Sequence, residues 1–236
     1  IMNRKNRSWN ALRPIQIQRN YLKQADASVL VSYGNTIVLC TASIESSVPG
    51  FLRGQGQGWV TAEYSMLPGA TRPRARRESK AGKQTGRTQE IQRLIGRSLR
   101  SVIDMKLLGE VSIVIDADVL QADGGTRTAA ITGGMVALSD SVQYCLANNI
   151  IRKNPIREWL AAVSVGIQDS QVLLDLDYEE DAIADVDMNV VMTESGKLVE
   201  VQGTAEHQVF DRGQLNTMLD VAELGITQLI QEAKKA

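Results

Sequence analysis

Hydrophobic and polar residues alternate in the first part of the chain with the period of two that is typical of β-strands. The alternating runs are IQIQRNY, SVLVSYGNT and IVLCTASIE, all within residues 15–45. Gly34-Asn35 lies between the apolar parts of the last two runs, and this pair favours the conformations of tight hairpin turns. We therefore expect strands here that are joined by a hairpin at this dipeptide.

The middle of the chain changes to helical spacing. Residues 87–108 predict an amphipathic helix because their hydrophobic residues recur every three or four positions. These residues are Ile91, Leu94, Ile95, Leu99 and Val102. Residues 111–120, VSIVIDADVL, are apolar enough for a central strand of a sheet. A second helix is expected over residues 128–149.

Strand patterns return after Pro155 in the runs LAAVSVGIQ, QVLLDLDYEE, DVDMNVVMTES and KLVEVQGTAE. A last helix is expected from about Asp211 to the end. The segment Val29–Glu45 aligns without gaps on Val190–Glu206, and each combines strand, turn, strand and a small-residue exit that ends in Glu. We interpret them as two related β-rich units. A chance resemblance between two hairpins is the alternative.

These elements predict a protein of the α/β (α+β) class, with mixed sheets and packed helices in a single domain over residues 1–236. The 236 residues are enough for a sizeable core, and 43% hydrophobic residues indicate a globular protein. No apolar run approaches the roughly 20 residues of a membrane span, so no membrane partner is expected. The basic N-terminus has no apolar stretch behind it, unlike a secretory signal.

The two cysteines, Cys40 and Cys145, are far apart and form no Cys-x-x-Cys motif. We interpret them as buried thiols in a reducing environment, which predicts a cytoplasmic protein. His207 is the only histidine. A zinc–histidine cluster is therefore excluded, and a mechanism of the Ser-His-Asp type would have to use this one residue.

The net charge of −1 conceals a strongly basic segment. Between Arg72 and Lys106 eleven basic residues stand against three acidic ones, and the rest of the chain is acidic. The stretch LPGATRPRARRESKAGKQTGR, residues 67–87, overlaps the start of this segment and has the composition of a mobile loop. It is either a solvated charged loop or a surface that contacts a phosphate backbone.

An unusual motif, QADGGTRTAAITGG, follows the strand predicted at residues 111–120 and opens a helix. The glycine pair Gly124-Gly125 allows a sharp turn, and the amides at a helix start favour anions. Arg127 adds a cation and Thr126 a hydroxyl donor. The motif is either an anion pocket or a plain strand-to-helix turn that is capped by Asp123 or Thr126.

Acidic residues gather in DLDYEEDAIADVDMN. We expect Asp175 and Asp177 on one strand, Asp185 and Asp187 on the next, and Asp181 in the connection close to them. Carboxylates placed in this way raise one another's pKa or bind a divalent cation such as Mg²⁺. A solvated acidic strand face is the alternative, although an arginine-rich anion site beside carboxylates and Mg²⁺ suits phosphoryl transfer.

Five long and unusual motifs cover much of the chain: GQGQGWVTAEYSMLPGAT, GRTQEIQRLIGRSLR, DADVLQADGGTRTAAITGG, DMNVVMT and EVQGTAE. They closely resemble bacterial members of the ribonuclease PH family, phosphate-dependent exoribonucleases that trim tRNA 3′ ends. The resemblance extends from about Leu12 to the C-terminal helix and implies the fold of that family. The N-terminus before Leu12 and residues 207–212 depart from the family pattern, but both lie away from these motifs in the sequence.

The resemblance implies phosphorolysis, in which inorganic phosphate is a co-substrate and a nucleoside diphosphate is released. The residues that match the family's phosphate-binding positions are Arg87, Gly125, Thr126 and Arg127. Its catalytic aspartates, which also hold Mg²⁺ or Mn²⁺, match Asp181 and Asp187. Its RNA-contacting loop matches Arg72, Arg74, Arg76 and Arg77. The implied partners are tRNA precursors and other RNA 3′ ends, and the implied assembly is a homohexamer built as a trimer of dimers. A catalytically silent RNA-binding ring subunit and a hydrolytic two-metal nuclease are the alternatives.

Overall fold

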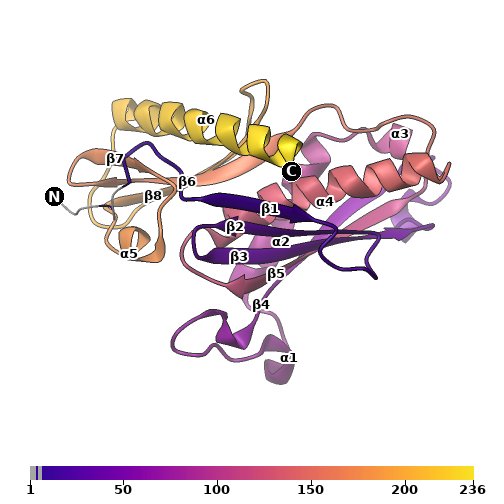
Figure 1. Ribbon diagram of the computed structural model, residues 1–236, viewed down its shortest axis with the longest axis horizontal. Coiled ribbons are helices and arrows are strands. Elements are labelled where there is room, and N and C mark those ends of the chain that lie inside the picture. Colours follow the sequence, from indigo (N-terminus) through magenta and orange to yellow (C-terminus); the bar gives the residue numbers. More distant parts are fainter. Residues whose placement is uncertain (1–3, 5–6) are drawn as a thin grey trace.

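The computed structural model describes residue 4 and residues 7–236 (Figure 1). The first of its two sheets contains β1 (Ile15–Arg19), β2 (Ala27–Tyr33), β3 (Thr36–Glu45), β4 (Trp59–Met66) and β5 (Ser112–Gln121). Their order is β1-β2-β3-β5-β4, and all neighbours are antiparallel except the parallel pair β4 and β5. The sheet is therefore mixed, as predicted.

The second sheet contains β6 (Leu160–Gln168), β7 (Gln171–Leu174), β8 (Val186–Thr193) and β9 (Leu198–Ala205). Its order is β7-β6-β8-β9 and every pair is antiparallel. The two segments that aligned in the sequence form the β2–β3 hairpin of the first sheet and the β8–β9 hairpin of the second. The prediction of two β-rich units is confirmed.

The described part of the chain holds six α-helices. Three are long: α2 (Gly86–Ser101), α4 (Thr126–Ala147) and α6 (Arg212–Lys235). Three have four residues each: α1 (Glu78–Ala81), α3 (Met105–Leu108) and α5 (Tyr178–Asp181). Two 3₁₀ turns, η1 (Gly50–Leu52) and η2 (Pro68–Ala70), complete the elements. In residues 7–236, no helix combines the length and the apolar character that crossing a membrane requires.

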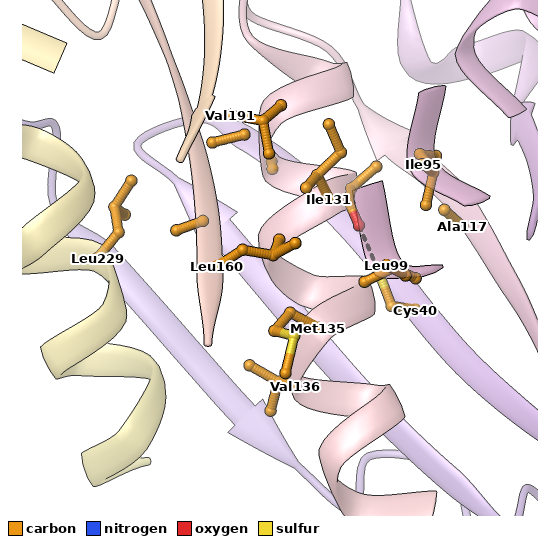
Figure 2. Close-up of a cluster of buried hydrophobic side chains, with 14 of the residues drawn as sticks. Cys40, Ile95, Leu99, Ala117, Ile131, Met135, Val136, Leu160, Val191 and Leu229 are labelled. Atoms are coloured by element: carbon orange, nitrogen blue, oxygen red, sulfur yellow. Dashed lines mark hydrogen bonds between the residues drawn. The ribbon is translucent and has the colours of Figure 1, made fainter. Parts of the chain in front are cut away.

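The core is shared by both sheets because α4 packs between them. α4 contacts β2, β3 and β5 on one side and β6 on the other. Figure 2 shows Ile131 and Met135 of α4 between Cys40 of β3 and Leu160 of β6. Gly133 allows this approach, since a Cβ there would lie 2.7 Å from the sulfur of Cys40. α2 packs on β4 beside α4, and α6 covers β6, β7 and β8 (Figure 1).

Two predicted elements end earlier than expected. The helix predicted over residues 87–108 stops at Ser101, because Asp104 caps a separate helix with its side chain and pairs its backbone N–H with the carbonyl of Pro155. The strand predicted over residues 171–180 stops at Leu174. Asp175 there adopts a left-handed conformation with φ +55°, which turns the chain out of the sheet.

Candidate functional site

A glycine turn joins the end of β5 to the start of α4. Gly124 and Gly125 have φ values of +76° and +66°, which residues with a side chain seldom adopt. Gly125 is the N-cap of the 22-residue helix α4. The first N–H groups of such a helix have no acceptor within it, and the helix dipole favours an anion there. The structure thus has the glycine turn and helix start that an anion pocket needs, and the anion pocket stays a prediction.

The loop that carries the aspartates packs directly on this turn. A Cβ at Gly124 would lie 2.6 Å from the carbonyl oxygen of Leu176 and 2.9 Å from the backbone nitrogen of Tyr178. No other residue type allows this approach without displacing one of the two segments. The glycine turn and the loop that leads to α5 can therefore lie this close only because Gly124 has no side chain.

The side chains at the start of α4 are held from three directions. Thr126 is buried, and its hydroxyl shares a 2.9 Å hydrogen bond with Tyr64 of β4. Arg127 donates to Gln202 of β9 at 2.7 Å and to Glu90 of α2 at 3.2 Å. Its side chain is only 13% exposed. Both predicted phosphate contacts therefore start from fixed positions.

Arg87 reaches the same place from the first turn of α2. Thr85 caps this helix by accepting a hydrogen bond from the backbone N–H of Thr88 at 3.2 Å. The carboxylate of Glu78 in α1 accepts from the Thr88 hydroxyl at 2.7 Å and from the Thr85 backbone at 3.1 Å. The basic loop is thereby anchored at the helix start that presents Arg87.

One cavity of about 970 Å³ collects most of the residues that the sequence singled out. The predicted residues in its lining are Arg72, Arg87, Gly125, Thr126, Arg127, Asp181 and Asp187. Asp181 is the last residue of α5, and Asp187 lies on β8. The cavity is also lined by polar residues that the sequence did not predict as site residues: Asn35, Ser164, Tyr178 and Asn189. The fold brings these positions together, and their roles stay predictions.

The two aspartates are electrostatically perturbed. Desolvation, together with the negative charge of Asp181, raises the pKa of Asp187 to about 6, although Arg127 and Arg87 oppose the shift. Desolvation also raises the pKa of Asp181 against the same two arginines. Within the described residues, the buried Oδ1 of Asp187 has no hydrogen-bond partner. An unpaired carboxylate oxygen with a raised pKa is prepared to accept a proton or a cation.

The carboxylates fit a hard divalent cation. Asp181 and Asp187 offer oxygen ligands of the kind that Mg²⁺ or Mn²⁺ prefers, including the unpaired Oδ1 of Asp187. The described part of the chain has no group of three or more Asp, Glu, His or Cys side chains placed to hold a metal. Mg²⁺ commonly uses one or two carboxylates and completes its shell with water and phosphate oxygens.

The four arginines of the basic loop are divided between two places. Arg72 lines the cavity with the aspartates. Arg76 and Arg77 line a neighbouring cavity of about 830 Å³, which also contains Arg87. Arg74 lines neither and donates a hydrogen bond to the nearby carbonyl of Ala75 at 3.4 Å. The loop therefore extends cationic surface away from the aspartates.

The prediction that Asp175 and Asp177 lie on a strand beside the other aspartates is wrong. Asp175 is fully buried and forms an ion pair with Arg13 at 2.7 Å. Asp177 is the N-cap of α5, where it accepts from the Glu180 backbone at 2.9 Å. The alternation of QVLLDLDYEE suggested a strand, but the left-handed turn at Asp175 separates these residues from Asp187. Sequence reasoning also missed Arg13, since no local pattern marks its contact with a residue 162 positions away.

Comparison with known proteins divides the chain as its sheets do. The model of the 3′ exoribonuclease family, domain 1, matches residues 11–142, which contain β1 to β5. The model of domain 2 of that family matches residues 159–224, which contain β6 to β9. The single domain over residues 1–236 stays a prediction.

Three solved structures share the fold over almost the whole chain. Rrp46 from rice (Oryza sativa) has a TM-score of 0.79 and 17% identity, with 98% of each chain covered. A chain of an Archaeoglobus fulgidus exosome with RNA bound to the active site has a TM-score of 0.79 and 20% identity, covering 97% of this chain and 91% of that one. A chain of an archaeal exosome core has a TM-score of 0.76 and 17% identity, covering 98% and 90%.

Proposed function

Because the chain belongs to the 3′ exoribonuclease family, we propose that it is a phosphorolytic 3′-to-5′ exoribonuclease that removes terminal nucleotides from tRNA precursors. Inorganic phosphate is the second substrate, and the products are a nucleoside diphosphate and a shortened RNA. The product keeps a phosphoric anhydride, so the reaction also runs in reverse and adds nucleotides from nucleoside diphosphates.

One observation carries this proposal. A single cavity holds Arg87, Arg127 and the start of α4 opposite two aspartates of raised pKa. A hydrolytic nuclease needs carboxylates and a site for the phosphodiester that it cleaves, but it does not need a second anion site for its nucleophile, which is water. A phosphorolytic enzyme needs both, because the nucleophile is itself an anion.

The cationic groups reduce the repulsion between the two anions that react, inorganic phosphate and the phosphodiester. An oxygen of inorganic phosphate attacks the terminal phosphodiester, and the bond from that phosphorus to the 3′-oxygen of the preceding nucleotide breaks. Two anions must meet for this step, so concentrated positive charge is required. Arg87 and Arg127 supply the charge, and the amides of the Gly125–Thr126 turn orient the attacking phosphate.

Asp187 is the residue that acts on the leaving 3′-oxygen in this proposal. With a pKa raised to about 6, it holds a proton more readily than an ordinary aspartate and can deliver it to that oxygen. Asp181 and Asp187 would hold Mg²⁺ or Mn²⁺, which would supply neutralisation of the charge on the leaving oxygen. The pH profile of kcat separates the two roles: proton donation fails as pH rises above the pKa, whereas ionised ligands work better there.

Further features support the RNA substrate and the assembly. An exosome structure of this fold holds RNA at its active site. The arginines Arg72, Arg74, Arg76 and Arg77 extend from the cavity as a surface for the RNA backbone.

We propose a homohexamer, a trimer of dimers, as the resemblance to bacterial ribonuclease PH implies. The two free, buried cysteines support a place in the cytoplasm.

The deciding experiment incubates a tRNA precursor, labelled at its terminal nucleotide, with Mg²⁺ in the presence and absence of inorganic phosphate. Nucleoside diphosphate that forms only with phosphate supports the proposal. Nucleoside monophosphate released regardless of phosphate identifies a hydrolytic nuclease instead. RNA binding without any product identifies a silent ring subunit.

A further inference from the structure

A buried arginine, Arg13, bonds to both segments that form the candidate site, the glycine turn and the aspartate loop. Arg13 precedes β1 and is 7% exposed. Its Nη1 donates to the carbonyl oxygen of Asp123 at 2.6 Å, on the glycine turn. Its Nε and Nη2 donate to the two oxygens of Asp175 at 3.0 and 2.7 Å, on the aspartate loop. One guanidinium thus connects the turn that starts α4 with the loop that leads to Asp181.

The partner of Arg13 has a strained backbone. Asp175 is fully buried, with φ +55°. Its Oδ2 also accepts from the backbone N–H of Arg13 at 2.8 Å, and its own N–H donates to the carbonyl of Ser164 at 2.7 Å. A non-glycine residue stays in this region only when its surroundings hold it there. The Arg13 pair therefore maintains the bend that directs the chain toward α5.

The glycine turn packs closely on Arg13. A Cβ at Gly125 would lie 3.0 Å from Nη2 of Arg13. A second tie comes from Arg7, which donates to the carbonyl of Asp175 at 2.8 Å and to Glu180 at 2.7 Å. Glu180 immediately precedes Asp181 in α5. A displacement of the guanidinium would be transmitted to both walls of the cavity.

We propose that Arg13 is a positioning residue that acts through Asp175 to set the spacing between the Gly124–Thr126 turn and Asp181. Arg13 does not line the cavity, so it acts on bound phosphate through the backbone that it holds and through its charge, which also reaches Asp181. The inference rests on the proposed function, because it assigns the spacing to the binding of the attacking phosphate next to the carboxylates.

The test replaces the planar fork by a point charge. Arg13→Lys keeps a cation but cannot bind Asp175 with two parallel hydrogen bonds and reach Asp123 as well. We expect the KM for inorganic phosphate to rise at least tenfold and kcat to fall, while RNA affinity measured without phosphate stays within twofold. A merely structural role would lower the folded fraction and the apparent kcat and leave the phosphate KM unchanged, which would overturn the proposal.

Arg19→Lys is the matched control. Arg19 lies on β1, pairs with Asp140 of α4 and donates to the carbonyl of Ala233 at 2.8 Å, away from the cavity. The same chemical change there should leave the phosphate KM unchanged. An equal rise of the KM in Arg19→Lys would show that any loosened N-terminal arginine has this effect, and would also overturn the proposal.

A second variant keeps the proposal testable if Arg13→Lys does not fold. Asp175→Asn disturbs the same pair from the other side: the amide oxygen can still accept from Arg13, but the amide NH2 faces another of its donors and the counter-charge is lost, so the phosphate KM should also rise. Calorimetric titration with inorganic phosphate separates this question from the proposed function. If the wild-type protein binds phosphate but releases no nucleoside diphosphate, the proposed function fails, whereas weaker phosphate binding by the variants still supports the positioning role. Unaltered phosphate affinity in a folded variant rejects that role.

Discussion

Arg127 donates a 2.7 Å hydrogen bond to Oε1 of Gln202, which ties the first turn of α4 to β9 of the second sheet. The same Nη1 also donates to Glu90 of α2 at 3.2 Å. A cation that is already oriented loses little side-chain freedom when an anion binds. The candidate phosphate site thus has a fixed charge whose position depends on both sheets.

Arg127→Ala should raise the KM for inorganic phosphate about 10- to 100-fold, since a hydrogen bond to a charged group contributes roughly 1.5–3 kcal/mol. RNA affinity should change little. Steady-state kinetics at varied phosphate measure the effect. Arg97→Ala is the control, because Arg97 forms an exposed ion pair with Glu200 outside the cavity. A phosphate KM like that of the wild type would remove Arg127 from the site.

Asp187→Asn should abolish turnover without lowering stability. The amide of the variant can neither donate the proton nor bind the cation as the carboxylate would. The change breaks no hydrogen bond of Oδ1, which has none, and it removes the repulsion from Asp181. Turnover and thermal unfolding are measured on the same sample. Asp185→Asn, two residues earlier and outside the cavity lining, should retain activity. Substantial turnover by Asp187→Asn would exclude Asp187 from the chemistry.

The raised pKa of Asp187 also predicts a pH dependence of stability. Its pKa is about 6 in the folded protein against an ordinary value of 3.8, so the folded state binds the proton more tightly than the unfolded chain does. This stabilisation is present in full below about pH 4 and is lost as pH rises through 6. Without divalent cations, the Tm of Asp187→Asn should exceed that of the wild type above pH 6, and the gap should close toward pH 4. A gap that stays constant with pH would contradict the shifted pKa.

Neutralising the basic loop should weaken RNA binding and flatten its salt dependence. Each lost phosphate contact should reduce the slope of log K against log salt by about 0.7 for single-stranded RNA. The substituted residues are Arg72, Arg74, Arg76 and Arg77. A charge-matched control replaces four exposed basic residues elsewhere: Arg152, Lys153, Arg157 and Lys235. Equal slopes for the two variants would mean that the loop has no special contact with the RNA backbone.

Gly124→Ala should lower both stability and activity. Its φ of +76° strains any side chain, and the new Cβ would lie 2.6 Å from the carbonyl oxygen of Leu176. We expect a loss of about 1–3 kcal/mol in the free energy of unfolding. Gly69→Ala is the control in the same cavity lining, because no atom lies within 4 Å of its Cβ position. Denaturant unfolding measures both, and equal losses would contradict the close approach.

The sequence predicted the local part of the site and missed the long-range part. The turn at Gly124 and Gly125 was recognisable because strand, glycine pair and helix are contiguous along the chain. Arg87 was assigned only through the family resemblance, since nothing local marks an exposed arginine at the start of α2. Asp175 was placed on a strand face because its neighbours alternate, although its conformation depends on Arg13, 162 residues away. Ion pairs between distant segments leave no periodic trace in a sequence.

The unpaired oxygen of Asp187 places activity and folding in opposition. A gene copy that no longer has to support turnover could replace this aspartate by asparagine through a single-base change, and its product would fold at least as well. The change to asparagine then does not lower the free energy of unfolding, whereas the change back to aspartate does. On the proposed function, descendants that bind RNA without turnover should therefore arise more often than they regain activity.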